Sequence, residues 1–285
     1  MKIIAAYDGS KYGRWAIEWV EHLPLKAPSR LTVVHVVDPQ WVPPPRVVQP
    51  AVVGNQRIER AEIQRLEKLT ERLLAKAQKL SVVVSLGGKV IKERGAIPKM
   101  ILEHAPKRNG MVILGSRGLS ALDRFMLGSV STRVAQYAPC PVLVVKQPPR
   151  TIRRILLAMD RSKSSSNGLN FLIARMVPNI LPSQNDTCTI EVVVAYALPF
   201  DYSRGNCTVP HVDEGARRLR QAGFRVVERV EMGDPAATIL KIAAKQKPDL
   251  IVTGSKGIGA VERLFVGSVS YQVLQQASCS VLIIK

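Results

Sequence analysis

The sequence predicts an α/β protein built from two tandem doubly wound domains. Short apolar runs rich in branched residues alternate with segments of helical periodicity. The segment 115–131, GSRGLSALDRFMLGSVS, recurs as 254–270, GSKGIGAVERLFVGSVS. The chain has 285 residues, which is long enough for two ordinary domains. Five strands alternating with four helices in each copy are typical of a parallel sheet with helices on both faces.

The first copy supplies its elements in a regular order. We expect strands at 2–7, 31–37, 81–85, 111–114 and 142–145, and helices at 11–23, 57–80, 95–105 and 129–137. Residues 89–94 either extend the third strand or form a short β segment of their own. The segment 38–56 contains five prolines, so we expect neither helix nor central strand there. Whether it is a lid or a contact surface stays open.

The second copy repeats this order with a shorter middle. We expect it to use 155–160, 191–197, 249–253 and 281–284 as strands, with 213–222 as a reduced counterpart of the long helix. Residues 201–210 take the place of the proline-rich segment. The domains are therefore predicted at 1–146 and 151–285, joined by the linker 147–150.

Each glycine segment follows a buried strand and precedes a helix. The N–H groups at a helix start, together with the helix dipole, attract anions, and glycines let a ligand approach the backbone. Ser129 and Ser268 are expected to cap these helices, and Arg117 and Lys256 would each add a cation. Neither a Walker A loop nor a G-x-G-x-x-G fingerprint is present. The simpler alternative is that the glycines only turn a strand into a loop.

An aspartate ends the first strand of each copy. Asp8 and Asp160 lie where ligands bind in open parallel sheets, outside the carboxyl ends of the strands. Either carboxylate could contact a ribose or a bound Mg²⁺ ion. The alternative role, which is compatible with the first, is to cap the following helix, as Ser10 could also do.

Composition narrows the class of protein. No apolar run approaches the roughly 20 residues that span a bilayer, and the chain opens on a strand without a signal peptide, so we expect a cytoplasmic protein and no membrane partner. Cys140 and Cys279 occupy equivalent positions and are expected to be buried. There is no C-x-x-C and no histidine cluster. The net charge of +19 attracts anions, but its spread along the chain and the 5% aromatic content disfavour a nucleic-acid partner.

Both glycine segments fit the pattern G-2x-G-9x-G-[S/T], and in this the chain resembles the ATP-binding members of the universal stress protein family. The resemblance extends over nearly the whole chain. It implies the strand order 3-2-1-4-5 in each domain and pairing through the fifth strands, with 142–145 beside 281–284. It also implies ATP and Mg²⁺ as ligands.

The resemblance also implies binding residues. Asp8 matches the residue near the ribose and metal, and Val36 matches the strand-two residue whose backbone contacts adenine. The phosphate positions of the first copy are Gly115, Gly118, Gly128, Ser129, Val130 and Ser131. The matching positions of the second copy are Asp160, Tyr196, Gly254, Gly257, Gly267, Ser268, Val269 and Ser270. Arg161 replaces Gly9 and Tyr196 replaces Val36 in this correspondence, which favours the first site over the second.

The leading hypothesis is an ATP-binding stress or signalling protein that acts through nucleotide-dependent conformation or association, with little or slow hydrolysis. An ATPase or nucleotidyl transferase is the alternative, but no base near the motif is evident, since Asp123 and Glu262 are more simply solvated loop acids. A third class is an interaction scaffold whose motif only shapes loops. A homodimer and an unidentified protein partner both stay open.

Overall fold

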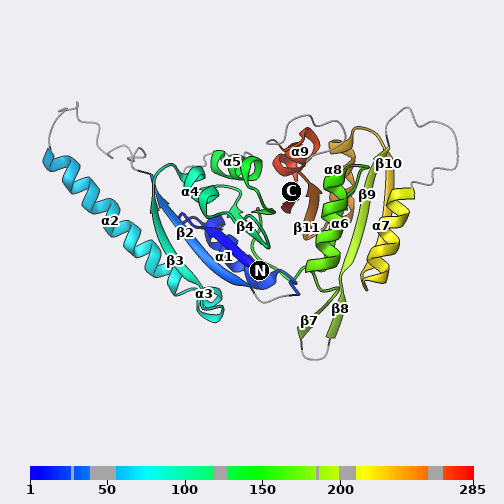
Figure 1. The fold of residues 1–285 in the computed structure, drawn as a ribbon, viewed down its shortest axis with the longest axis horizontal. Helices are drawn as coiled ribbons and strands as arrows, with labels where there is room; N and C mark the ends of the chain where they lie inside the picture. Colours follow the sequence, from blue (N-terminus) through cyan, green and yellow to red (C-terminus); the bar gives the residue numbers. More distant parts are fainter. Residues whose placement is uncertain (27–28, 39–55, 119–126, 184–185, 199–209, 256–265) are drawn as a thin grey trace.

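Among the residues that the structure describes, ten strands form one continuous sheet. The computed structural model describes residues 1–26, 29–38, 56–118, 127–183, 186–198, 210–255 and 266–285. The strands follow the order β10-β9-β6-β11-β12-β5-β4-β1-β2-β3, and Figure 1 shows the two halves of the chain side by side.

The first half forms five parallel strands in the predicted order 3-2-1-4-5. Its strands are β1 (Lys2–Ala6), β2 (Arg30–Val37), β3 (Lys89–Arg94), β4 (Gly110–Gly115) and β5 (Val142–Val145). Its helices are α1 (Lys11–His22), α2 (Gln56–Gln78), α3 (Ser81–Ser85), α4 (Ile97–His104) and α5 (Ser129–Tyr137).

The second half repeats the arrangement, again in the order 3-2-1-4-5. Its main strands are β6 (Arg154–Ala158), β9 (Glu191–Leu198), β10 (Arg225–Met232), β11 (Leu250–Gly254) and β12 (Ser280–Ile284). Its helices are α6 (Lys163–Arg175), α7 (Pro210–Gln221), α8 (Pro235–Gln246) and α9 (Ser268–Gln276). A separate antiparallel hairpin, β7 (Asn179–Ser183) and β8 (Asp186–Thr189), was not expected from the sequence.

Helices cover both faces of the sheet and bury an aliphatic core on each. One face packs against α1, α3, α6 and α7, with Trp19 as its largest fully buried side chain. The other face packs against α4, α5, α8 and α9. Both strands next to the junction, β5 and β12, are buried along their whole length. The doubly wound class predicted from the sequence is thus confirmed.

The segment 81–85 was predicted as a strand and is instead the short helix α3. Its valines favour a strand by propensity, but Val82 and Val83 are buried on the α1 side of the core, so packing overrides propensity. The third strand is the adjacent segment β3, whose lysines, glutamate and arginine suit an exposed sheet edge.

The halves meet through an antiparallel pair, β5 with β12, as predicted. Leu143 lies opposite Leu282, and Val144 lies opposite Val281. Because each half is parallel within itself, strand direction reverses only at this junction among the described strands of the large sheet. The two fifth strands therefore cover each other's edges.

A pair of lysines ties each half to a helix of the other. Lys146 follows β5, and its Nζ donates to the carbonyls of Gln275 (3.1 Å) and Ala277 (2.6 Å) at the end of α9. Lys285 follows β12, and its Nζ donates to Ala135 (2.5 Å) at the end of α5. A cation at a helix C-terminus satisfies open carbonyls and opposes the negative end of the dipole. Burial lowers the pKa of Lys146 from 10.5 to about 8.

Candidate functional site

Asp8 lies in the loop between β1 and α1 and is fixed by that loop. Its Oδ1 accepts a hydrogen bond from the Ser10 N–H (2.9 Å). Ser10 Oγ in turn accepts from the Gly13 N–H (3.0 Å), so of the two candidate caps Ser10, and not Asp8, is the N-cap of α1. Gly9 has a φ of +86°, a conformation that glycine adopts readily. The carboxylate is therefore held at the carboxyl end of the sheet.

Three hydrogen bonds close the first glycine segment into a loop. The Ser116 N–H donates to Val145 O (2.8 Å), and the Gly128 N–H donates to Ser116 O (2.8 Å). Ser131 Oγ donates to Gly115 O (2.7 Å), joining the first turn of α5 to the end of β4. The strand end and the helix start are thus adjacent, although Ser116 and Gly128 are 12 positions apart in the sequence.

Gly118 is a residue of this segment that lies next to Asp8. A Cβ placed on Gly118 would lie only 2.8 Å from Asp8 Oδ2, so the carboxylate closely approaches the loop backbone. Gly128 lies close to the start of the segment, since a Cβ there would lie 3.6 Å from the Arg117 Cα. The structure therefore brings together Asp8, the loop glycines, Arg117 and the start of α5.

The expected serine caps were wrong. Gly128 and Gly267 are the N-cap residues of α5 and α9, and Ser129 and Ser268 are the first helical residues, both exposed. Glycine has no side chain with which to accept from first-turn N–H groups. Both helices therefore begin without a side-chain cap from their own N-cap residue, which suits an external anion.

Arg117 contacts a residue that sequence reasoning missed. Its Nη1 donates to the Tyr12 hydroxyl (3.1 Å), and its guanidinium carbon lies 5.5 Å from the centroid of the Tyr12 ring. Gly115 packs directly on the same residue, because a Cβ there would meet Tyr12 Cβ at 2.6 Å. The only sequence signal was its place four residues after Asp8, in the first turn of α1.

The second half builds the same loop closure. The Ser255 N–H donates to Ile284 O and the Gly267 N–H to Ser255 O, both at 2.7 Å. Ser270 Oγ donates to Gly254 O at 2.6 Å. Asp160 repeats the turn of Asp8, since its Oδ1 accepts from the Ser162 N–H (2.8 Å). Lys256, Gly257, Asp123, Glu262 and nearly all of the segments 38–56 and 201–210 lie outside the described residues.

The strand-two correspondence between the copies needs a correction of one residue. Ala6 is paired with Val34 and Ala158 with Ala195, and the 152-residue offset of Asp8 and Asp160 makes Ala158 the equivalent of Ala6. Ala197, not Tyr196, is therefore the equivalent of Val36. The Tyr196 side chain is buried on the α6 and α7 face, whereas Val36 packs on the α4 and α5 face, because successive strand residues alternate.

The donor set at the first site suits a magnesium ion bound mainly by phosphates. Among the described residues, no group of three or more His, Cys, Asp or Glu could hold a metal ion by itself. Mg²⁺ is usually bound by one or two carboxylates together with phosphates and water. The single carboxylate of Asp8, facing the glycine loop, fits that mode. Asp160 is its counterpart in the second half.

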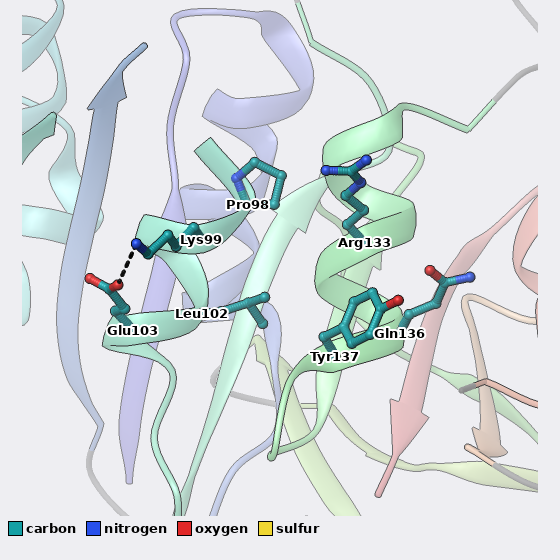
Figure 2. A pocket seen from close by; sticks show the side chains of 7 residues that line it. All are labelled: Pro98, Lys99, Leu102, Glu103, Arg133, Gln136 and Tyr137. Atoms are coloured by element: carbon teal, nitrogen blue, oxygen red, sulfur yellow. Dashed lines mark ion pairs between the residues drawn. The ribbon is translucent and has the colours of Figure 1, made fainter. Parts of the chain in front are cut away.

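A separate groove of about 540 Å³ lies between α4 and α5 (Figure 2). Its walls include the exposed ring of Tyr137 and the side chain of Arg133, with the Lys99 and Glu103 pair on α4. None of its lining residues is a predicted site residue, although the groove shares α5 with the first glycine segment. No helix among the described residues is long and apolar enough to cross a membrane.

The fold and these loops define a class: a tandem α/β protein whose halves each end a parallel strand in a glycine loop that leads into a helix. The model of the Universal stress protein family matches residues 1–146 and again 151–285. The chain belongs to the universal stress protein family.

Relatives of similar sequence carry the same family name, and a solved structure has the same fold. A universal stress protein of Mycolicibacterium smegmatis is 27% identical over 304 residues, covering 99% of this chain and 96% of the relative. The universal stress protein YxiE of Bacillus subtilis is 29% identical over 146 residues, which are 51% of this chain and 98% of YxiE. The crystal structure of a universal stress protein from Archaeoglobus fulgidus has a TM-score of 0.70 at 19% identity, covering 100% of this chain and 98% of that one.

Proposed function

We propose that this chain is a cytoplasmic ATP-binding protein of stress response or signalling, with one nucleotide site in each of two domains, 1–146 and 151–285. ATP with Mg²⁺ would change the conformation or the association of the domains, and so act on a protein partner. Hydrolysis would be slow or absent. The residues 147–150 form the linker.

The observation that carries the proposal is the loop closure found twice. In each half, a serine hydroxyl and two backbone N–H groups hold the end of the fourth strand against the start of an uncapped helix. In the first half, the carboxylate of Asp8 also lies close to the loop backbone at Gly118, next to the closed loop and the helix start. Such an arrangement suits an anion with a metal ion between it and the carboxylate.

The proposed ligand contacts follow the family pattern. Phosphates would lie against Gly115, Gly118 and Gly128 and the first turn of α5, with Arg117 as a cation. Asp8 would contact the ribose or Mg²⁺, and the backbone at Val36 would contact adenine. The second site would use the matching glycines, serines and Val269 of α9, with Lys256 and Gly257, Asp160 and the backbone near Tyr196 and Ala197.

Calorimetric titration of nucleotide-free protein with ATP and Mg²⁺ tests the proposal. Two sites per chain are expected, with one lost in Gly128→Val and the other in Gly267→Val. A Cβ on Gly128 would lie 3.3 Å from the Ser116 carbonyl oxygen, and Gly267 makes the matching backbone hydrogen bond to Ser255. One site lost only in Gly128→Val would restrict the proposal to the first half. Absence of binding to wild type would refute it and favour a scaffold.

An enzyme is the competing class, and turnover separates the two. Phosphoryl transfer needs a group that positions water or another acceptor and groups that stabilise the transferring charge. Asp8 and Arg117 would supply charge. Efficient ATP turnover that is abolished by Asp8→Ala would favour the ATPase or nucleotidyl transferase. Binding with a negligible turnover rate supports the nucleotide-dependent switch.

A further inference from the structure

The two glycine loops rest on different residues, although their backbones pack in the same way. A Cβ on Gly115 would meet Tyr12 Cβ at 2.6 Å, and a Cβ on Gly254 would meet Ser164 Cβ at 2.7 Å. The 152-residue offset between the first strands also makes Ser164 the equivalent of Tyr12. The first half therefore has an aromatic hydroxyl beneath its loop where the second has only a serine.

Tyr12 is itself held from two sides. The Trp15 ring meets it edge-on, with centroids 5.1 Å apart and an interplanar angle of 83°. Lys11 Nζ lies 5.1 Å from the Tyr12 centroid. In the second half Asn167 takes the position of Trp15, while Lys163 retains the cation of Lys11. The aromatic support is thus confined to the first of the two equivalent positions.

Tyr12 contacts Arg117, the cation of the first loop. The Tyr12 hydroxyl and ring both contact the Arg117 guanidinium, so the arginine is oriented before any ligand arrives. A prearranged guanidinium loses less conformational entropy when it binds a phosphate. The backbone of Arg117 lies beside the start of α5, because a Cβ on Gly128 would be 3.6 Å from the Arg117 Cα. The first loop therefore carries a basic residue next to the helix start.

A helix start and a guanidinium together discriminate between ligands by the length of the phosphate chain. A ligand with one phosphate would contact the helix start alone, whereas a chain of phosphates would be long enough to contact the guanidinium as well. Resting on the proposed function, we propose that Tyr12 is a positioning residue for Arg117 that makes the first site selective for nucleoside triphosphates over monophosphates. The second site has Ser164 in place of Tyr12 and is less selective.

Titrations with ATP and with AMP test this inference in wild type, Tyr12→Phe and Tyr12→Ser. Tyr12→Phe removes the hydrogen bond and keeps the ring, and Tyr12→Ser installs the residue that the second half already accommodates. The Trp15 ring contacts Tyr12, so tryptophan emission reports on the first site, with Trp15→Phe as the blank. We expect Tyr12→Ser to raise the Kd for ATP about tenfold and the Kd for AMP less than about twofold.

Two further variants separate positioning from a structural effect. In an Arg117→Gln background, Tyr12→Phe should no longer change the ratio of the ATP and AMP affinities, because its target is gone. Arg14→Gln removes a basic group that is 63% exposed on the same helix and should leave the ratio unchanged. Circular dichroism and the midpoint of urea unfolding confirm that each variant is folded.

The outcomes of these titrations test the inference about Tyr12 separately from the proposed function. A loss of ATP selectivity in the Tyr12 variants that depends on Arg117 supports the inference. Binding to wild type with an unchanged ATP to AMP ratio in both Tyr12 variants overturns it and leaves the proposed function standing. Equal losses for both nucleotides overturn it as well, because they indicate a general disturbance of the loop. Absence of binding to wild type overturns the proposed function, and this inference with it.

Discussion

Replacing Lys146 by methionine should abolish one component of the pH dependence of stability. Burial lowers the pKa of the Lys146 ammonium from 10.5 to about 8. Between these two values the unfolded chain binds more protons than the native protein, so the free energy of unfolding rises with pH. Below the lower pKa, Lys146 is protonated in both the native and the unfolded protein. The native protein then carries the full unfavourable effect of the buried charge.

The size of the effect follows from the difference in pKa. At about 1.4 kcal/mol per pKa unit, the lowering from 10.5 to about 8 is worth about 3 kcal/mol. Near pH 9.5 the Lys146 side chain is almost neutral in the native protein. In the unfolded chain its protonated form still exceeds its neutral form about tenfold. The rise from about pH 7 to about pH 9.5 is therefore about 2 kcal/mol. The carbonyls of Gln275 and Ala277 favour the charged form and make this an upper value.

The assay is urea unfolding of wild type and Lys146→Met at about pH 7 and about pH 9.5. Groups that titrate in both proteins cancel in the comparison. Lys99→Met, at a side chain that is 72% exposed, is the matched control and should keep the wild-type rise. The reasoning is refuted if Lys146→Met gains as much stability with pH as wild type does.

Two further substitutions and one labelling experiment test the packing and burial of other residues. Gly13→Ala would place a Cβ 2.6 Å from Asp8 Oδ1, so we expect about 1–3 kcal/mol of lost stability in urea and weaker ATP binding; unchanged binding would contradict the role given to that carboxylate. Cys140 and Cys279 are buried, with pKa values raised to about 11 by that burial, so site-resolved mass spectrometry should find neither alkylated in native protein near pH 8. Ser270→Ala removes the hydrogen bond to the Gly254 carbonyl and should cost about 1–3 kcal/mol in thermal unfolding, and a smaller loss would show that water replaces the hydroxyl.

The sequence allowed most of the fold to be predicted because burial on both faces leaves continuous apolar runs. The strand 142–145 and the helix 129–137 were placed with their observed bounds, and the pairing of the fifth strands was anticipated. Errors arose where local propensity and tertiary packing disagree. Three successive valines at 82–84 indicated a strand, but the chain uses them to pack a helical turn against α1.

The candidate site was less predictable because it depends on contacts between distant segments. The glycines fix where the loop is, yet the contact between Tyr12 and Arg117 joins residues 105 positions apart. The one-residue shift at strand two could not be seen without the sheet register, since Tyr196 and Ala197 both lie in an apolar run. The short hairpin β7–β8 has few apolar residues, so its periodicity was weak.

The antiparallel junction between β5 and β12 pairs two halves of one chain, so each molecule contains one copy of each half. Where two identical chains meet around a two-fold axis, every contact occurs twice and both copies of a site must be the same. Here the lysine contacts also occur twice, since Lys146 contacts α9 and Lys285 contacts α5. The two halves are joined in one chain, however, and their sequences differ. The covalent link gives every molecule one Tyr12 loop and one Ser164 loop, at any protein concentration. Joining the halves in one chain thus lets two sites of unequal character share one continuous sheet, an arrangement that identical chains paired in this way do not provide.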